Sequence, residues 1–275
     1  MLLSLGGESG DYGFNSDYEA ENFADVLWNS FGEGSDYPKD ERPFGDAIVD
    51  GFDFDLENEN QIGYVTLANK LKNLTSSGNQ KEFILTSAPQ CPFPDKSNSE
   101  LIDGVELDYL FIQFYNNKCA LDQDFNFDTW SEYIQSKNYE KTKLFIGLPA
   151  TNSSASSGFV DSDAVLEKIE QIWSSDELKK SFGGVMFWDA SQAFEDSEAG
   201  INSLQDNLVN KVASNFQKDN SSEGSSGTTV SNSPAASNIT SAKGKTSDSG
   251  VLKPSSSSSS IFICLALSFF FACFV

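Results

Sequence analysis

Three carboxylates occupy alternate positions in one apolar stretch of the chain, at Asp53, Asp55 and Glu57. Alternation is the period of a β-strand, so the three acids lie on one face and the intervening apolar residues on the other. A buried unpaired charge is costly, and neighbouring carboxylates compete for protons. The row therefore predicts an acid–base site of a hydrolase, in which Glu57 is the general acid and Asp55 helps to manage a second charge.

Two other interpretations of the acidic row are a calcium loop and a solvated edge strand. Calcium loops interleave Asp and Asn with Gly and small polar residues, whereas the residues interleaved here are Phe52, Phe54 and Leu56. An edge strand would need helices outside it to cover those apolar residues, and it does not explain acids that point inward. The pattern favours a site built on carboxylates.

Composition restricts the chemistry further. The chain has 275 residues, no histidine and a net charge of −23. Without histidine, Ser-His and Cys-His catalysis are excluded and a zinc site is disfavoured, so we expect no metal and no cofactor. An acidic surface repels nucleic acid and anionic membranes, whereas a neutral polysaccharide is a compatible partner. Carboxylates, Tyr, Asn, Gln and Trp must supply the chemistry.

Strand and helix patterns alternate along the chain, which is typical of a parallel β/α architecture. Six apolar strand candidates lie at about 1–6, 46–56, 82–88, 107–115, 143–150 and 183–190. The first helix begins at a capping box of Ser16 and Glu19 and stops at Gly32. Its apolar stripe consists of Phe23, Val26, Leu27 and Phe31. A second helix carries a stripe of Tyr64, Leu67, Leu71 and Leu74, and a third carries Val165, Leu166, Ile169, Ile172 and Trp173. A last helix is predicted near 196–215.

Five segments resemble motifs of one enzyme family, in the family's order. Residues 50–57, which read DGFDFDLE, resemble the D-G-x-D-x-D-x-E signature of family 18 glycoside hydrolases, the chitinase family. Residues 4–7 resemble the S-x-G-G motif that ends the family's third barrel strand. The remaining segments resemble the fifth, sixth and eighth strand ends of the plant and fungal class III type, at 88–95, 113–117 and 183–188.

The resemblance implies a TIM (β/α)8 barrel, which has eight strands and about 250 residues. It covers about residues 1–215, and the first strand here matches the family's third. We therefore expect residues 1–216 to be a family 18 catalytic barrel that lacks the first two β/α units, an N-terminally incomplete version of a longer protein; the alternative is a real truncated product, which would be an inactive fragment.

The resemblance also implies substrate-assisted, retaining hydrolysis of β-1,4 linkages in chitin. Glu57 would protonate the glycosidic oxygen and later activate water, while the N-acetyl carbonyl attacks the anomeric carbon. Asp55 would hold the acetamido N–H, and Asp53 would share a proton with Asp55. Tyr115 would hydrogen-bond the acetamido oxygen.

Three further residues are implied as substrate contacts. Gln113 and Asn116 would contact sugar or support the catalytic residues, and Trp188 would form an apolar floor under the sugar. Trp188 as an ordinary core residue and Tyr115 as a strand-end aromatic remain alternatives. Ser4 and the two glycines after Leu5 are expected to be structural, since glycine permits close backbone approach.

Other functions stay open for this fold. Some members bind sugars or inhibit other proteins without catalysis, and they typically lose the terminal Glu or the neighbouring Asp. A cell-wall structural protein using the barrel as a display head is a third possibility. Because Asp53, Asp55, Glu57 and Tyr115 are all present, an enzyme is favoured. We expect it to be a monomer.

Cysteines and sequons indicate the secretory pathway. Cys91 and Cys119 follow neighbouring predicted strands, so adjacent loops can bring them together in a disulfide; the alternative is two free thiols. The other cysteines, Cys264 and Cys273, lie in the terminal apolar run. N-glycosylation sequons occur at Asn73, Asn152, Asn220 and Asn238.

The C-terminal part differs in composition. Residues 217–250 are rich in Ser, Thr, Gly, Ala and Asn, which predicts a disordered stalk. Residues 251–275 end in an apolar run, too short for a typical spanning helix, which is typical of a GPI-attachment propeptide. We expect attachment at Asp248, on the plasma membrane or on cell-wall glucan, as in yeast cell-wall chitinases; a tail-anchored helix is the alternative.

Overall fold

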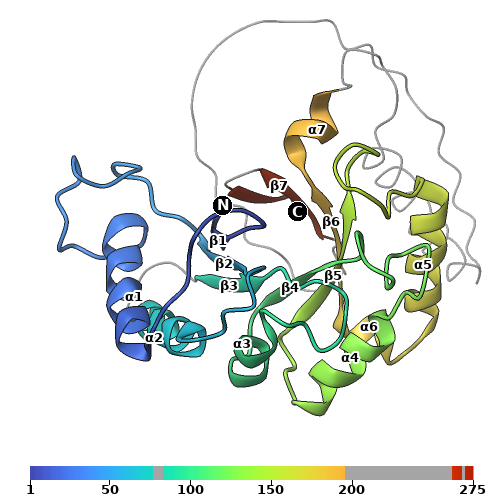
Figure 1. The fold of residues 1–275 in the computed structure, drawn as a ribbon, viewed down its shortest axis with the longest axis horizontal. Coiled ribbons are helices and arrows are strands. Elements are labelled where there is room, and N and C mark those ends of the chain that lie inside the picture. The colour runs from blue at the N-terminus through green and yellow to red at the C-terminus, as the bar shows by residue number, and fades with distance from the viewer. Residues whose placement is uncertain (77–82, 196–261, 268–269, 275) are drawn as a thin grey trace, which may run out of the picture.

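Parallel strands alternate with helices around a closed barrel (Figure 1). The computed structural model describes residues 1–76, 83–195, 262–267 and 270–274. The strands are β1 (Leu2–Gly6), β2 (Gly51–Asp55), β3 (Ile84–Ser87), β4 (Tyr109–Gln113), β5 (Lys143–Pro149), β6 (Phe182–Trp188), β7 (Phe262–Leu267) and β8 (Phe270–Phe274). The helices are α1 (Asp17–Phe31), α2 (Tyr64–Ser76), α3 (Ser99–Gly104), α4 (Phe127–Ser136), α5 (Ser162–Ser174), α6 (Leu178–Ser181) and α7 (Ala190–Glu195).

The order of the strands around the barrel is their order in the chain. Each strand from β1 to β6 is parallel to the next, and β7 is parallel to β6. Strand β8 is antiparallel to both β7 and β1 and closes the wall. The six predicted strands are confirmed, and the fold is the TIM-barrel-like α/β fold expected from the sequence.

The two C-terminal strands lie within the segment predicted to be a GPI-attachment propeptide, 251–275. Such a propeptide is removed when the anchor is added. Strand pairing in the chain before removal therefore does not test that prediction.

Strand β2 is shorter than the predicted 46–56. Pairing with β1 begins with Leu2 opposite Gly51 and ends with Gly6 opposite Asp55. Just before this register, Asp50 N donates to the Met1 carbonyl at 2.7 Å. Glu57 accordingly lies two residues beyond the strand, at the rim of the barrel.

Helix α1 begins and ends as predicted. Ser16 accepts a hydrogen bond from Glu19 N at 3.3 Å, and the Glu19 carboxylate reaches back to Asn15 N at 2.7 Å, which satisfies N–H groups that a helix start leaves free. The predicted stripe is wrong at Val26, which is 41% exposed. The buried face instead includes the small side chains of Ala20 and Ala24, and Ala20 packs beside Gly63 directly before α2.

Apolar residues on β2 alternate as the sequence predicts. Phe52 and Phe54 are fully buried in the layer between the sheet and the helices. Inside the barrel a smaller apolar cluster fills the space, formed by Leu2, Ala88, Phe111, Phe145 and Met186, with Trp188 packed against it. The inner face therefore consists of an apolar plug with the acids above it, toward the carboxyl ends of the strands.

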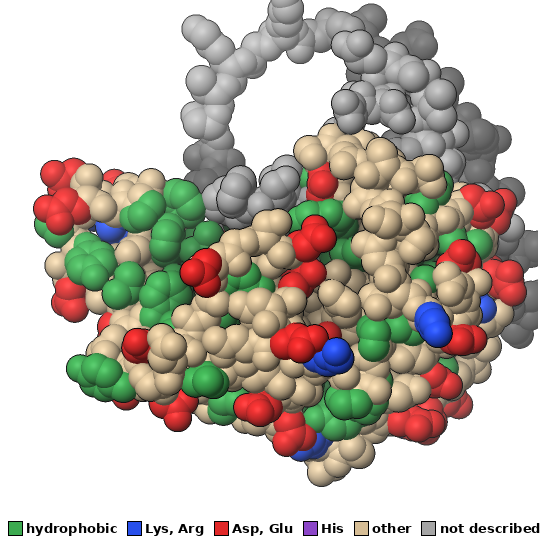
Figure 2. All heavy atoms as spheres, viewed as in Figure 1, with side chains coloured by type: hydrophobic (Ala, Val, Ile, Leu, Met, Phe, Trp, Pro, Cys, Tyr) green, Lys and Arg blue, Asp and Glu red, His purple; other side chains and the backbone are tan. Residues whose placement is uncertain are grey.

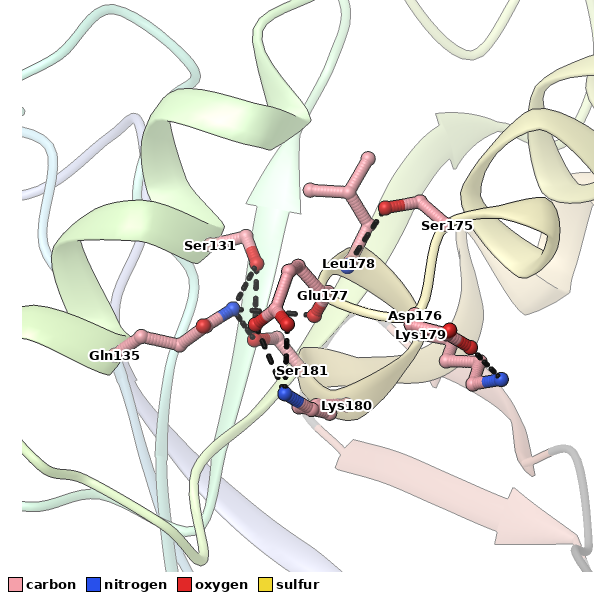
Figure 3. Close-up of polar contacts among 9 residues, drawn as sticks. All are labelled: Ser131, Gln135, Ser175, Asp176, Glu177, Leu178, Lys179, Lys180 and Ser181. Atoms are coloured by element: carbon pink, nitrogen blue, oxygen red, sulfur yellow. Dashed lines mark hydrogen bonds and ion pairs between the residues drawn. The ribbon is translucent and has the colours of Figure 1, made fainter.

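A network of polar side chains lies at the amino end of β6, on the side of the barrel opposite the carboxyl ends of the strands (Figure 3). Ser131 on α4 donates to Ser181 at the end of α6 at 3.0 Å, and both side chains are buried. Gln135 donates to Ser131 at 2.9 Å and to the Glu177 carbonyl at 3.2 Å. The network joins α4 to α6 directly before β6 begins. It therefore holds the first residues of β6, whose other end lies at the cavity described below.

Acidic side chains are scattered over the visible face, with few basic ones (Figure 2), as the net charge of −23 requires. No helix in the described ranges is long and apolar enough to cross a membrane. The predicted helix at 196–215, the stalk at 217–250, the attachment residue Asp248 and the sequons Asn220 and Asn238 lie outside the described residues.

Candidate active site

Asp53 is the deepest of the three acids and is fully buried inside the barrel. It accepts hydrogen bonds from the hydroxyls of Ser4 on β1 at 2.7 Å and Thr86 on β3 at 2.5 Å. Burial raises its pKa to about 6, although both hydroxyls act in the other direction by favouring the charged form. Asp53 can therefore take up or release a proton near neutral pH.

Asp55 lies above Asp53 and reaches the cavity with only 8% of its surface exposed. The Gln113 side-chain amide on β4 lies 3.2 Å from Asp55 Oδ1 and donates to it. Burial, followed by the charges of Glu57 and Asp53, raises the pKa of Asp55 well above its ordinary value. Ionisation of this carboxyl is therefore unfavourable beside the other negative charges of the row.

Glu57 is half-buried at the rim. Its Oε1 lies 3.3 Å from the Gln113 amide nitrogen, and its Oε2 lies 3.4 Å from the amide nitrogen of Gln90. Its backbone N–H donates to the Tyr12 hydroxyl at 2.8 Å, and that hydroxyl donates to the Gly7 carbonyl at 2.9 Å. Residues that follow or end other strands thus hydrogen-bond both parts of Glu57: Tyr12 contacts its backbone, and Gln113 and Gln90 contact its carboxylate.

A cavity of about 500 Å³ opens at the carboxyl ends of the strands. It is lined by Glu8, Asp55, Glu57, Ala88, Gln90, Gln113, Tyr115, Asn116, Asn117, Ser153, Ser154, Ala155, Ser156, Met186 and Trp188. Loops after strands at this end of a β/α barrel form the usual active-site position. Asp53 does not line the cavity and lies beneath it.

Tyr115 follows β4 and is buried at 6% exposure, with part of its surface on the cavity. Its phenol pKa is raised well above the ordinary value by burial and then by the negative charges of Asp55 and Glu57. The phenol therefore keeps its proton across the range in which proteins fold. It can donate a hydrogen bond to a ligand but cannot serve as a base.

The predicted contact residues also line the cavity. Gln113 is buried and bridges Asp55 and Glu57. Trp188 at the end of β6 is half-buried, packs on the apolar plug and presents the rest of its ring to the cavity. Asn116 is exposed and has φ 57°; its side chain accepts from Ser157 N at 3.0 Å, which holds the loop after β5.

The structure adds residues that the sequence did not single out. Tyr12, Gln90 and Asn117 contact or support Glu57, and residues 153–156 form a hydroxyl-rich wall. Tyr12 lies in a loop with no pattern, so no sequence signal marked it. Gln90 and Asn117 stand inside two of the quoted motifs, and their position next to a cysteine pair was the available signal.

Cys91 and Cys119 form a disulfide in the structure, with an S–S distance of 2.01 Å. It joins the loop after β3 to the loop after β4. The backbone supports the same junction, since Gln113 N donates to the Pro89 carbonyl at 2.8 Å. The two loops that carry Gln90 and Asn117 are therefore fixed relative to each other.

Two predicted glycosylation sequons lie in the described residues. Asn73 on α2 and Asn152 after β5 are both exposed, as a glycan acceptor must be. Asn152 directly precedes the hydroxyl-rich wall of the cavity. Modification at either position stays a prediction.

Both the sequence and the fold of the chain are similar to those of known proteins. Chitinase 1 of Candida albicans is 51% identical over 193 residues, which are 70% of this chain and 39% of its own length. The chain thus spans about two fifths of the curated relative that it matches.

Two solved structures share the fold. The xylanase and alpha-amylase inhibitor protein from Scadoxus multiflorus is 31% identical, with a TM-score of 0.64 over 76% of this chain and 73% of that one. A chitinase from Ipomoea carnea is 34% identical, with a TM-score of 0.59 over 72% of this chain and 71% of that one. The model of glycosyl hydrolases family 18 matches residues 1–182, more than half of the chain. The chain therefore belongs to glycosyl hydrolases family 18, as its motifs predict.

Proposed function

We propose that the protein is a chitinase that hydrolyses β-1,4 linkages between N-acetylglucosamine units by substrate-assisted, retaining catalysis. The observation that carries the proposal is the convergence of Asp55, Glu57 and Tyr115 on one cavity, with Asp53 directly beneath. Similarity to chitinases from Candida albicans and Ipomoea carnea supports the substrate class.

In the first step, Glu57 donates its proton to the glycosidic oxygen as the bond to the anomeric carbon breaks. The carbonyl oxygen of the substrate's own acetamido group attacks that carbon and forms an oxazolinium ion. The Tyr115 hydroxyl donates to this oxygen and aligns it for attack. In the second step, Glu57 takes a proton from water as the water attacks the anomeric carbon and opens the oxazolinium ring. The anomeric configuration is therefore retained.

The two buried aspartates manage the positive charge of the intermediate. Asp55 accepts the acetamido N–H and is most effective as a carboxylate, which requires its proton to leave. Asp53, whose pKa is about 6, can take up this proton when the oxazolinium charge favours an ionised Asp55. The hydroxyls of Ser4 and Thr86 hold Asp53 in place for the exchange.

The remaining walls suit a neutral sugar. Trp188 offers an apolar face to the sugar ring, and the amides of Gln113 and Asn116, with the hydroxyls of 153–156, offer hydrogen bonds. We further propose a secreted, cell-surface protein that acts on chitin in cell-wall remodelling or cell separation. The predicted GPI attachment at Asp248 and the association with cell-wall glucan belong to the same proposal.

A second candidate is a non-catalytic binding protein. This candidate is supported by structural similarity to the xylanase and alpha-amylase inhibitor protein, with a TM-score of 0.64. The complete acidic row argues for the enzyme, since a binding protein has no need of three acids that exchange protons.

One assay separates the two candidates. The full chain is incubated with fluorogenic chitobiose and chitotriose substrates, and binding of unlabelled chitotriose is measured in parallel. The enzyme proposal predicts turnover with release of the fluorophore. Saturable binding without turnover would support the binding protein, and neither binding nor turnover would contradict both.

A further inference from the structure

Gln90 and Asn117 form a side-chain pair beside the acid Glu57. The Gln90 amide nitrogen lies 3.4 Å from Glu57 Oε2, and the Asn117 amide nitrogen lies 3.1 Å from Gln90 Oε1. Both side chains line the cavity. The contact to Glu57 is long, as catalytic hydrogen bonds often are before substrate binds.

The orientation of this pair is fixed by a backbone carbonyl. The Asn117 amide nitrogen also lies 3.2 Å from the Tyr115 carbonyl oxygen, which can only accept. The NH2 group of Asn117 must therefore face Tyr115 and Gln90. Since Gln90 Oε1 accepts from that NH2 group, the NH2 group of Gln90 faces Glu57. Neither amide can reverse without losing a hydrogen bond.

The backbone around the pair is held as firmly as the side chains. Gln90 N donates to Asp95 Oδ2 at 3.2 Å, and the Cys91–Cys119 disulfide joins the two loops directly beside the pair. The distance between Gln90 and Asn117 is therefore set by covalent and hydrogen-bonded neighbours rather than by the pair itself.

The surroundings give Glu57 little other compensation for negative charge. The titratable groups around it are all acids or phenols, Glu8 and Tyr12 after β1, Asp53 and Asp55 on β2, Asp95 after β3 and Tyr115 after β4. No Lys or Arg of the described chain lines the cavity. The amides of Gln113 on Oε1 and Gln90 on Oε2 are the neutral donors that face the carboxylate.

We infer that Gln90 is a positioning residue for Glu57, and that Asn117 is the residue that orients it. The inference rests on the proposed function for its kinetic meaning. Gln90 holds Oε2 while Glu57 is ionised, between its action as an acid and its action as a base. Each carboxylate oxygen keeps a second lone pair, so the donor does not block the proton that Glu57 must carry.

The kinetic test uses Gln90→Met, which keeps the length of the side chain but removes the donor. We expect kcat to fall roughly tenfold, the value of one hydrogen bond to a charged group, with KM little changed. The basic limb of the pH profile should move to higher pH, because the lost donor favoured the ionised form. Gln171→Met is the matched control: Gln171 donates to Glu167 at 3.1 Å on exposed α5, and its loss should change nothing.

The relay from Asn117 is tested by a double-mutant cycle. Asn117→Ala should shift the profile in the same direction by a smaller amount. In the position of the basic limb, the double variant with Gln90→Met should behave like Gln90→Met alone, because Asn117 reaches Glu57 only through Gln90. Additive effects, or a basic limb that does not move in Gln90→Met, would overturn the inference.

A readout without turnover keeps the inference separate from the proposed function. The side-chain NH2 resonances of Gln90, assigned by their loss in Gln90→Met, are followed against pH in the ligand-free protein. They should titrate in the wild type and stop titrating in Glu57→Gln. Resonances that titrate unchanged in Glu57→Gln would refute the contact even in an active enzyme, whereas an inactive wild type with the expected titration would refute only the chitinase proposal.

Discussion

Thr86 and Asp53 are joined by a hydrogen bond of 2.5 Å between adjacent strands, wholly inside the barrel. The hydroxyl donates and the carboxylate accepts, so the bond favours the ionised form of Asp53. Burial acts more strongly in the other direction and raises the pKa from 3.8 to about 6. Asp53 therefore binds a proton at about pH 6, directly below Asp55 and Glu57.

The raised pKa of Asp53 predicts a pH dependence of stability. Because Asp53 binds its proton more tightly when folded, its contribution to the free energy of unfolding is full below about pH 4 and is lost as pH rises through about 6. The loss amounts to roughly 3 kcal/mol. Asp53→Asn carries no such proton, so its free energy of unfolding should decrease less than that of the wild type between about pH 4 and about pH 7. Urea unfolding at the two pH values measures this, and equal decreases would contradict the assignment.

Asp55→Asn should separate stability from activity. The variant keeps the shape of the side chain and the donor from Gln113, and removes a carboxyl that is costly to ionise when buried. Its melting temperature should therefore equal or exceed that of the wild type. Its kcat should fall about a hundredfold or more, because an amide does not stabilise the positive intermediate. A kcat close to that of the wild type would show that Asp55 is not needed as a carboxylate.

Two adjacent glycines, Gly6 at the end of β1 and Gly7 directly after it, allow a matched comparison. Both have positive φ, 111° at Gly6 and 109° at Gly7. A Cβ at Gly6 would lie 2.2 Å from the Asp55 carbonyl oxygen, whereas a Cβ at Gly7 would have no atom within 4 Å. Gly7→Ala should cost about 1–2 kcal/mol of backbone strain, and Gly6→Ala clearly more, since the backbone of β2 must move. Urea unfolding of both variants gives the order, and an equal cost would argue against close approach of the strands.

The disulfide predicts a large loss when both cysteines are replaced. The bond closes a loop with a sequence separation of 28 residues. Loop-closure entropy of that size corresponds to roughly 3–4 kcal/mol. The Cys91→Ala/Cys119→Ala variant should lose about this free energy of unfolding, and non-reducing mass mapping should find the pair joined in the wild type. Free thiols in protein prepared under oxidising conditions would contradict the pairing.

Much of the fold could be predicted from the sequence because the signals are local and strong. The alternation of Phe52 and Phe54 with acids gave the two faces of β2, and Ser16 and Glu19 gave the start of α1. Strand bounds were predicted less well, since β2 ends where its pairing with Gly6 ends, at Asp55, whereas the apolar pattern continues to Leu56. Val26 was misplaced because a helical stripe several residues wide does not show which edge faces solvent.

The candidate site was predictable where motifs carried it and not elsewhere. Glu57, Tyr115 and Trp188 were found because they stand at strand ends within recognisable segments. Tyr12 was missed because it reaches Glu57 from a loop, by a contact across 45 positions of the sequence. Gln90 and Asn117 lie within recognisable motifs, but the orientation of their amides depends on the Tyr115 carbonyl, whose position only the structure gives.

The most direct test of the whole account is the activity of Glu57→Gln in the full chain, compared with Glu59→Gln. Glu59 lies two residues further on, outside the cavity, where it pairs with Lys96 at 3.1 Å. We predict that Glu57→Gln folds with an unchanged melting temperature and loses fluorogenic chitotriose hydrolysis by at least about a thousandfold, while Glu59→Gln retains it. Hydrolysis by Glu57→Gln at the wild-type rate would contradict the account.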